Sequence, residues 1–427
     1  MVHIKPQQIP QLLGKHPHWA KIQPILKKLS SNGFSVWLVG GSVRDLLLGK
    51  MPKDFDLVTA ASVKDMFELF PEALEVGKSF GIAILPLEGF QVEIATLRKE
   101  GAYQDGRHPQ KIEHTNDPRE DALRRDFTVN ALFWDPFKME LLDFVGGLRD
   151  LQKKVLKTVG DPLVRFQEDH LRVLRAIRFA AQLDFEIEPQ TRKAIEQTAP
   201  LILKISKERV FQELNKILHF KSRGIYELMS CSLFQVLFPF LKGTEAYWPF
   251  LKKAFHKALE RESFLWALFL LPHVLQDFEE RFSMSKKSLK ELRCSNAFLR
   301  EWSFFVKGVK ELEEFLQAER YVKAVQLLDE PLGKELLYLA RLKRSIDGLE
   351  QKDLDSLERY YLSLLDKQTG HLPKPLINGH DLKKMGTVIG PRMSFLLEQI
   401  YEYQLQNQIK DKDTLLDNLE EIVKEEF

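Results

Sequence analysis

The glycine-rich turn at residues 40–45, Gly-Gly-Ser-Val-Arg-Asp, contains residue types that bind phosphate. Gly40 and Gly41 let backbone N–H groups approach an anion without a Cβ in the way. The apolar run at residues 36–39 predicts a strand before this turn, and the pattern after it predicts a helix, whose N-terminus favours negative charge. The guanidinium of Arg44 adds a charged donor for the same oxygens. The turn therefore predicts a site for a triphosphate.

Two carboxylates, Asp54 and Asp56, follow this turn closely in the chain. In a strand their spacing places both carboxylates on one face, with Phe55 and Leu57 on the other. A hard cation such as Mg²⁺ suits this arrangement, because it shares one or two protein carboxylates with substrate phosphates. Either motif alone is more often a turn or a solvated loop, so the prediction of a metal-dependent nucleotide site depends on their occurring together.

A third acid is predicted on a neighbouring strand. Residues 91–98 alternate like a half-buried strand, with Val92 and Ile94 on one side and Glu93 on the other. Glu93 is therefore a candidate catalytic acid near the metal ions. The alternative is an exposed strand residue without a catalytic role.

Residues 165–178 predict a helix with a polar and an apolar face. With 3.6 residues per turn, Asp169 and Arg172 lie one turn apart on the polar face. The apolar stripe that docks this helix consists of Leu171, Leu174 and Ile177. A carboxylate and a guanidinium at fixed separation can read the edge of a base, and each good bidentate contact contributes ~1–3 kcal/mol of discrimination. The alternative is an intrahelical ion pair.

These motifs resemble those of the DNA polymerase β type of nucleotidyltransferase. More narrowly, they resemble the class II tRNA nucleotidyltransferases, which are the CCA-adding enzymes, and the related bacterial poly(A) polymerases. The resemblance is strong from about residue 36 to about residue 209. The matching segments are residues 40–56, residues 121–131 (Asp-Ala-Leu-Arg-Arg-Asp-Phe-Thr-Val-Asn-Ala), residues 143–151, residues 168–172 and, in the C-terminal part, residues 379–391.

The resemblance implies a Mg²⁺-dependent enzyme that adds C, C and A to tRNA 3′ ends from CTP and ATP without a nucleic-acid template. Two metal ions at Asp54 and Asp56, with Glu93 nearby, would leave positioning and charge neutralisation to the protein. The Asp169 and Arg172 pair would accept C and A and reject U and G. The implied nucleotide-binding residues are Gly40, Gly41, Arg44, Arg124, Arg125, Asp126, Asn130, Asp169, Arg172, Arg175 and Arg178. An A-adding or CC-adding enzyme and a bacterial poly(A) polymerase share these motifs and stay open as alternatives.

Residues 98–109 are polar, punctuated by glycine and without clear periodicity, which predicts a flexible loop. In the family that this chain resembles, a loop at this place takes part in the switch from C to A addition. Arg98, Asp105 and Arg107 are the candidate participants. A simple surface loop is the alternative for each of them.

Composition indicates a soluble protein of two or more domains, since 427 residues exceed one ordinary core. No apolar run reaches the roughly 18–20 residues of a membrane span and the N-terminus lacks a signal-peptide pattern, so we expect a cytoplasmic protein without membrane contact. Cys231 and Cys294 have no partner pattern for a disulfide or zinc site. The net charge of +2 is small, so RNA contact requires a local basic stripe. No obligate protein partner is evident.

The expected fold class is an α/β N-terminal nucleotidyltransferase domain, a polymerase β-like palm with a mixed sheet, followed by an elongated all-α C-terminal region. The expected domains are a catalytic head at residues 1–150, a nucleotide-selecting neck at 151–242, a helical body at 243–370 and a tRNA-contacting helical tail at 371–427. A binding protein with an inactive transferase domain is disfavoured by the intact Asp54, Asp56 and Arg125. A small-molecule nucleotidyltransferase would need neither the base-reading pair nor the long helical region.

Overall fold

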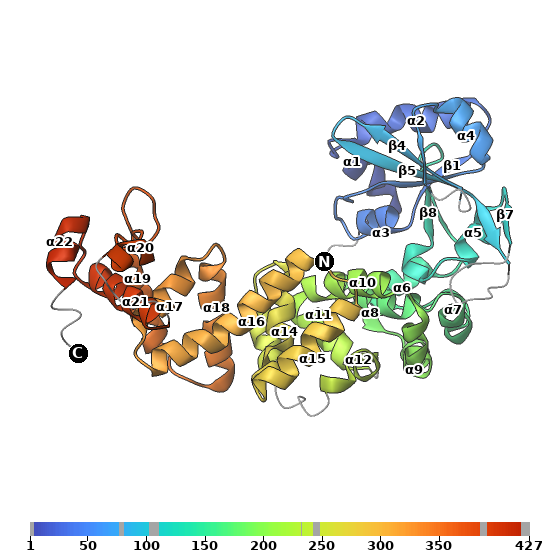
Figure 1. Ribbon diagram of the computed structural model, residues 1–427. Helices are drawn as coiled ribbons and strands as arrows, with labels where there is room; N and C mark the ends of the chain where they lie inside the picture. Colours follow the sequence, from blue (N-terminus) through green and yellow to red (C-terminus); the bar gives the residue numbers. More distant parts are fainter. Residues whose placement is uncertain are drawn as a thin grey trace. The chain divides into compact units, whose positions relative to one another are not determined.

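The computed structural model describes residues 4–76, 81–101, 111–231, 233–241, 248–384 and 391–419. The chain divides into two compact units, Met1–Lys242 and Gly243–Phe427 (Figure 1). The four-domain division expected from the sequence stays a prediction. The strands, all in the first unit, are β1 (Val36–Val39), β2 (Asp56–Thr59), β3 (Leu74–Val76), β4 (Ile82–Leu87), β5 (Phe90–Thr96), β6 (Arg98–Glu100), β7 (Ile112–His114), β8 (Leu132–Asp135), β9 (Glu140–Asp143), β10 (Val155–Leu156) and β11 (Glu186–Ile187).

Seven of these strands form one mixed sheet in the order β3-β4-β5-β2-β1-β8-β9. Within it β2 and β5 run parallel, whereas β1 pairs antiparallel with both β2 and β8. β1 is central and buried along its whole length, as expected for a continuous apolar run inside a sheet. The side chains of β5 alternate, with Val92 and Ile94 buried in the core and Glu93 on the opposite face, as the sequence predicts. The sheet therefore carries its polar residues on one side of β2 and β5.

Helices cover the sheet and continue beyond it in the first unit. Here α2 packs on β1, α4 packs on β4, and α3 contacts both β1 and β8. A hydrophobic cluster that includes Trp37, Val58 and Phe133 fixes the strands that carry the polar residues. The helices of the head are η1 (Pro6–Gln8), α1 (Ile9–Leu13), α2 (Trp19–Ser31), α3 (Gly41–Leu47), α4 (Val63–Leu69), α5 (Pro118–Leu123), η2 (Thr128–Asn130) and α6 (Gly147–Lys153).

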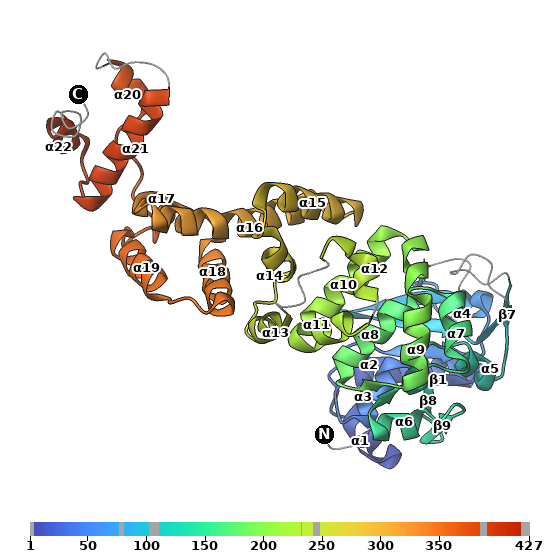
Figure 2. The same ribbon diagram turned by 90° about the horizontal axis from the view of Figure 1, so that it is seen from below.

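The following helices complete the first unit. α8 packs against α10 and α11, and α7 packs against α9 (Figure 2). These helices are α7 (Pro162–Glu168), α8 (Arg172–Leu183), α9 (Pro189–Thr198), η3 (Ala199–Lys204), α10 (Lys207–His219), α11 (Lys221–Met229), α12 (Leu233–Leu237) and η4 (Pro239–Leu241).

The prediction of one helix over residues 165–178 is wrong. α7 ends at Glu168 and α8 begins at Arg172, with Asp169 in an extended conformation between them (φ −136°, ψ 104°). The Asp169 carboxylate accepts a hydrogen bond from the backbone N–H of Leu171 at 3.1 Å. This local bond competes with helix continuation and satisfies a backbone donor where α8 begins. The predicted apolar stripe is nevertheless buried.

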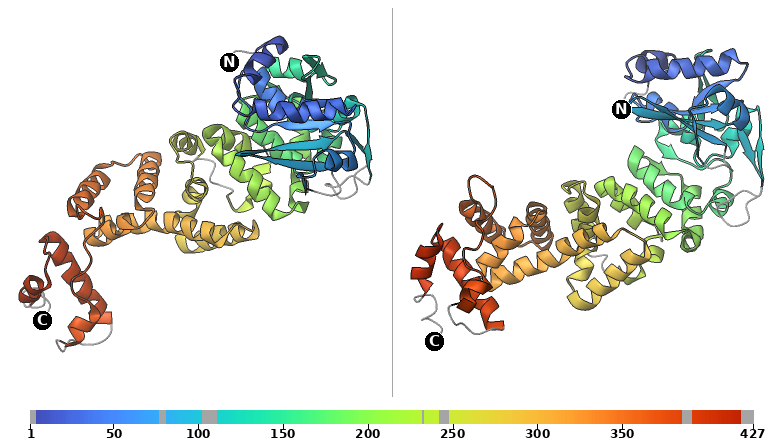
Figure 3. Two further views of the ribbon diagram at one scale, coloured as in Figure 1. Left: turned by 90° about the horizontal axis from the view of Figure 1, so that it is seen from above. Right: turned by 45° about the horizontal axis from the view of Figure 1, so that its top comes forward.

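Every regular element described in the second unit is a helix. α14 is buried almost throughout, and α16 packs against α14, α15, α17 and α18. Figure 3 shows the helices of this unit, coloured yellow to red, in two further views. The helices are α13 (Trp248–His256), α14 (Glu262–Val274), α15 (Phe278–Glu291), α16 (Asn296–Gln317), α17 (Tyr321–Asp329), α18 (Gly333–Asp347), α19 (Lys352–Leu364), α20 (Gly379–Lys384), α21 (Pro391–Gln406) and α22 (Lys412–Asp417). In the described part of the chain, no helix combines the length and apolar character that a membrane crossing requires.

Candidate active site

The glycine turn connects β1 to α3, as the sequence predicts. Gly40 has positive φ (66°), a conformation that side chains other than glycine rarely adopt, and it precedes the first turn of α3. A Cβ on Gly40 would lie 3.2 Å from the Arg125 guanidinium and 3.7 Å from an Asp56 carboxylate oxygen. The turn therefore lies directly beside the Asp56 carboxylate and the Arg125 guanidinium.

Arg44 lies in α3 with its side chain almost fully buried. Its guanidinium donates a hydrogen bond to Asn130 Oδ1 at 2.6 Å and forms an ion pair with Asp45 at 2.8 Å. These partners fix the orientation of the guanidinium beside the glycine turn. An oriented guanidinium loses less conformational freedom when it binds phosphate.

The parallel register of β2 and β5 places Asp56 directly opposite Glu93. Asp54 differs from the expectation, because it lies in a bend and β2 begins only at Asp56. β1 ends at Val39 and the chain turns at Gly40, so Asp54 has no antiparallel strand residue opposite it. Burial, followed by the negative charge of Asp54, raises the pKa of Asp56, although Arg125 opposes the rise. Burial and the charge of Asp56 likewise raise the pKa of Glu93.

Beyond burial, the charge of Asp54 contributes to the raised pKa of Asp56 and the charge of Asp56 to that of Glu93, so the neighbouring acids repel one another. A bound cation would relieve this repulsion, and carboxylate oxygens are the donors that Mg²⁺ prefers. Among the described residues, however, no three His, Cys, Asp or Glu side chains form a cluster that could hold a metal ion alone. Two carboxylates combined with substrate phosphates and water still fit Mg²⁺ chemistry. Asp54 and Asp56 thus fit a magnesium site, and a metal-ligand role for Glu93 stays a prediction.

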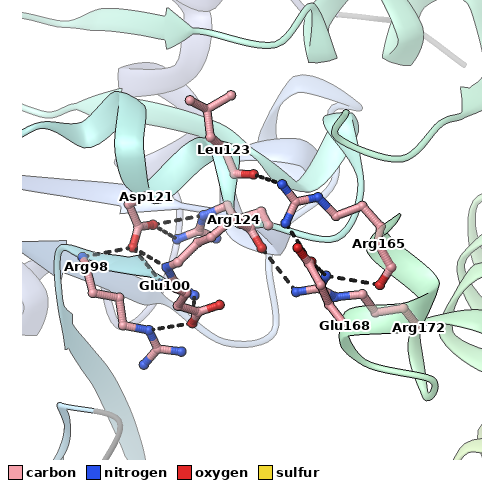
Figure 4. A network of polar contacts seen from close by, with 9 residues as sticks. Arg98, Glu100, Asp121, Leu123, Arg124, Arg165, Glu168 and Arg172 are labelled. Carbon is pink, nitrogen blue, oxygen red and sulfur yellow. Dashed lines mark hydrogen bonds and ion pairs between the residues drawn. The ribbon is translucent and has the colours of Figure 1, made fainter. Parts of the chain in front are cut away.

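The basic residues of the matching segment at residues 121–131 are held by a buried acid, Asp121 (Figure 4). Its carboxylate forms ion pairs with Arg124 at 2.6 Å and Arg125 at 3.0 Å. Burial disfavours ionisation of Asp121, but the two guanidinium groups outweigh it and hold its pKa below the ordinary value. Glu100 joins this network by pairing with Arg98 at 2.9 Å and with Arg124 at 3.3 Å.

A second part of the network joins α7 and α8 to the end of α5 (Figure 4). Glu168 Oε2 accepts hydrogen bonds from Arg165 at 2.8 Å and from Arg172 at 2.7 Å. Arg172 also donates to the backbone carbonyl of Arg124 at 3.2 Å. Asp169 does not share a helix with Arg172, and its carboxylate lies 3.8 Å from the Arg209 guanidinium. The predicted base-reading residues are therefore held by different partners.

An aromatic ring, Phe179, organises the remaining arginines of α8. The guanidinium carbons of Arg44, Arg175 and Arg178 lie 5.5, 5.3 and 4.1 Å from its ring centroid. Arg175 also pairs with the buried Asp126 at 2.5 Å, and Arg178 pairs with Glu213 of α10 at 2.8 Å. Cation–π contacts of this kind stabilise desolvated guanidinium groups. The ring therefore lets three like charges lie close together.

One cavity of about 1010 Å³ in the first unit brings these groups together. Its lining includes every predicted site residue within the described part of the chain: Gly40, Gly41, Arg44, Asp54, Asp56, Glu93, Arg98, Arg124, Arg125, Asp126, Asn130, Asp169, Arg172, Arg175 and Arg178. Asp105 and Arg107 lie outside the described residues. Lining residues that sequence reasoning missed are Asp45, Lys50, Lys53, Glu100, Phe179 and Arg209.

Comparison with known families first gives the class of the protein. Residues 36–157 match the family described as the Poly A polymerase head domain, and residues 184–244 match the probable RNA and SrmB-binding site of polymerase A. The first unit is therefore a nucleotidyltransferase of this class.

Whole-chain relatives define the family more narrowly. The chain is 35% identical over 399 residues to a CCA-adding enzyme of Streptococcus suis, covering 90% of this chain and 93% of the relative. It is 30% identical over 413 residues to a CCA-adding enzyme of Bacillus licheniformis, covering 94% and 98% respectively. The crystal structure of the Bacillus stearothermophilus CCA-adding enzyme in complex with CTP superposes with a TM-score of 0.73 and 26% identity, covering 96% of this chain and 100% of that chain.

The chain belongs to the CCA-adding enzymes, which are tRNA nucleotidyltransferases. This confirms the family predicted from the motifs. The expected fold class, a mixed α/β head followed by a helical region, is confirmed as well.

Proposed function

We propose that this protein adds C, C and A to the 3′ end of tRNA, using CTP and ATP and no nucleic-acid template. One observation carries the proposal: the two acids, the glycine turn, the arginines at residues 124–125 and the arginines of α8 all line one cavity. The relatives named CCA-adding enzyme support the same activity across nearly the whole chain. Because these relatives are bacterial, we expect the reaction to take place in the cytoplasm.

The acids and the glycine turn would position the two reacting groups, the RNA 3′-hydroxyl and the triphosphate. Asp54 and Asp56 would bind Mg²⁺, which activates the RNA 3′-hydroxyl and neutralises the triphosphate when bound. The backbone of Gly40 and Gly41 and the guanidinium of Arg44 would orient the triphosphate for in-line attack. Since Arg44 is already fixed by Asn130 and Asp45, binding needs little reorganisation of the protein.

The residues at the start of α8 would select the base. Asp169 would accept from the exocyclic amine that cytosine and adenine share, and Arg172 would donate to neighbouring acceptors on the base. Glu168 and the Arg124 carbonyl hold the Arg172 guanidinium in place. A guanidinium held in this way rejects a base with the wrong pattern, because it cannot swing aside at low cost.

Replacing Arg172 tests this proposal. We expect Arg172→Ala to relax the choice of nucleotide more than it slows transfer, because the lost contact to the base contributes ~1–3 kcal/mol of discrimination. The measurement compares incorporation of CTP, ATP, UTP and GTP into tRNA that lacks its CCA end. Glu168→Gln, which keeps Arg172 but weakens its ion pair, should have a smaller effect in the same direction. Unchanged selectivity in Arg172→Ala would remove this residue from base selection.

A further inference from the structure

A side chain from the N-terminal segment contacts the chain on both sides of Asp54. His16 lies in the connection between α1 and α2, and its side chain is buried. Its Nε2 lies 3.1 Å from the backbone carbonyl oxygen of Pro52, shortly before Asp54. The same ring makes an edge-to-face contact with Phe55, directly after Asp54, with ring centroids 4.7 Å apart. One side chain, distant in sequence, thus holds the chain before and after a proposed metal ligand.

Asp54 depends on such support because it lies outside the sheet. α3 ends at Leu47 and β2 begins at Asp56, so Asp54 belongs to an irregular segment. Asp56, by contrast, is held in β2 by its register with Glu93 of β5. Two carboxylates that share one Mg²⁺ must keep a fixed separation, because this ion demands near-ideal octahedral geometry. A shift of the irregular segment would move one metal ligand and leave the other in place.

The hydrogen bonds of His16 determine which of its ring nitrogens carries the proton. Its Nδ1 lies 3.2 Å from the backbone nitrogen of His18. A backbone N–H can only donate, so Nδ1 accepts and Nε2 of the neutral ring carries the proton. Nε2–H therefore donates to the carbonyl oxygen of Pro52. Because Pro52 is itself buried, water does not easily replace this donor.

The segment that carries His16 is itself anchored on the head. α1 packs on α3, and α2 packs on β1. The backbone N–H of His16 donates to the carbonyl of Leu13 at 2.9 Å, and the N–H of Trp19 donates to the carbonyl of His16 at 3.1 Å. The ring of Trp19 adds a second aromatic contact to Phe55, with centroids 5.9 Å apart. The imidazole is therefore a fixed support and not a freely moving side chain.

We propose that His16 is a positioning residue that holds Asp54 in the geometry required for Mg²⁺ binding. This inference rests on the proposed function, because it takes Asp54 and Asp56 as the metal ligands. His16 acts through the backbone of Pro52 and the ring of Phe55, and it is not a ligand itself. Residues that orient metal ligands typically contribute roughly 10–100-fold to metal affinity. If His16 served only to pack the N-terminal helices, its replacement would change stability and not metal affinity.

The test is binding of Mn²⁺ alone, as a spectroscopic substitute for Mg²⁺, to the full-length protein. Electron paramagnetic resonance measures the free aqueous ion. His16→Phe keeps a ring against Phe55 but removes the donor, and we expect it to weaken Mn²⁺ binding by about tenfold. His16→Gln places an amide N–H near the position of Nε2 and should restore most of the affinity. The matched control is His18→Phe, because this side chain stacks on Phe90; its Mn²⁺ affinity should equal that of the wild type.

A transfer assay at saturating tRNA and CTP gives an independent readout. In His16→Phe the Mg²⁺ concentration for half-maximal transfer should rise about tenfold, and excess Mg²⁺ should restore kcat. A rate that falls equally at every Mg²⁺ concentration, or a Mn²⁺ affinity equal to that of the wild type, would overturn the proposal. If His16→Phe unfolds in a thermal melt, His16→Asn takes its place, since its shorter side chain brings no N–H to the Pro52 carbonyl.

Failure of the proposed function would give a different result. If Asp54→Asn abolishes Mn²⁺ binding but the wild type transfers no nucleotide to tRNA, the proposed function is contradicted and the role of His16 is not. If Asp54→Asn leaves Mn²⁺ binding unchanged, Asp54 is not a metal ligand and the positioning role of His16 is overturned with it.

Discussion

At the scale of single residues, the folded state disfavours the ionised forms of two acids in the site, Asp56 and Glu93. Asp56 and Glu93 face each other on parallel strands, and burial raises the pKa of both. By contrast, Asp121 and Asp126 are buried with arginine partners that lower their pKa. Asp56 therefore fits a cation site together with Asp54, while a metal-ligand role for Glu93 stays a prediction, and the second pair orients guanidinium groups.

Replacing Asp56 by its neutral isostere separates catalysis from stability. A raised pKa means that the folded state disfavours the carboxylate, so Asp56→Asn should leave the melting temperature unchanged or raise it. Transfer should fall by at least about a hundredfold, since one charged ligand is lost. Asp65→Asn is the opposite control, because this carboxylate caps α4 by accepting from the Ser62 backbone and hydroxyl. That variant should melt earlier and keep its activity, as thermal melts and transfer assays would show.

The two glycines of the turn should respond differently to the same substitution. Gly40 has positive φ and little room beside Arg125, so Gly40→Ala should cost about 1–2 kcal/mol of stability and reduce transfer. Gly41 has ordinary φ, and a Cβ there would lie at a normal 3.5 Å from Arg44. Gly41→Ala should therefore be neutral or slightly stabilising. Denaturant unfolding of both variants measures their free energies of unfolding. Equal losses of stability in the two variants would contradict the described conformation of the turn.

Sequence reasoning located residues that line the cavity and missed several residues that support them. Gly40, Asp56 and Arg125 were predictable because local spacing and motif order identify them without a fold. Phe179 was not predicted, because Arg175 and Arg178 lie beside it on α8 but Arg44 comes from a distant part of the chain. Asp121 could have been found, because it precedes Arg124 and Arg125 by three and four residues on a helix.

At the scale of elements, the break between α7 and α8 was hidden by a continuous periodicity. Residues 165–178 have the spacing of one helix, yet Asp169 bonds to the backbone of Leu171 and starts a second one. A side chain that can cap a helix competes with helix continuation, and periodicity does not report that competition. The strands were easier to predict, because alternating burial in β5 and continuous burial in β1 appear directly as apolar patterns.

Helix α14 should make the second unit sensitive to acid. Burial, together with the nearby Arg281, lowers the pKa of His273 to about 4. An unfolded histidine has a pKa of about 6.5, so between these values the unfolded chain binds a proton that the folded chain does not. Stability should therefore fall as pH drops from about 6.5 to about 4, by at most about 1.4 kcal/mol per pH unit.

The measurement for this prediction is denaturant unfolding at several pH values. His273→Leu should show a shallower decline over this range than the wild type, because the titrating group is gone. Parallel declines in the two proteins would show that other groups cause the acid sensitivity.

At the scale of the whole molecule, a net charge of only +2 conceals a strong local separation of charge. The arginines of the active-site cavity are paired with buried acids or stacked on Phe179, whereas Lys286, Lys290, Arg300 and Lys307, on α15 and α16, form no ion pair with any described residue. Paired arginines hold a nucleotide in a defined orientation, and unpaired lysines attract a polyanion from solution. These four unpaired cations belong to the second unit, whereas the arginines of the active-site cavity belong to the first.

The most direct test of the account offers the purified protein three tRNAs, ending at the discriminator base, at the first C and at the second C. Each is incubated with CTP, ATP or both, and the products are resolved at single-nucleotide length. We predict ordered addition that stops after CCA, with no addition from ATP alone unless the tRNA already ends in CC. Three results would contradict the account. Addition of A only, and only to the tRNA ending in CC, would indicate an A-adding enzyme. Arrest after CC would indicate a CC-adding enzyme, and a long A tail would indicate a poly(A) polymerase.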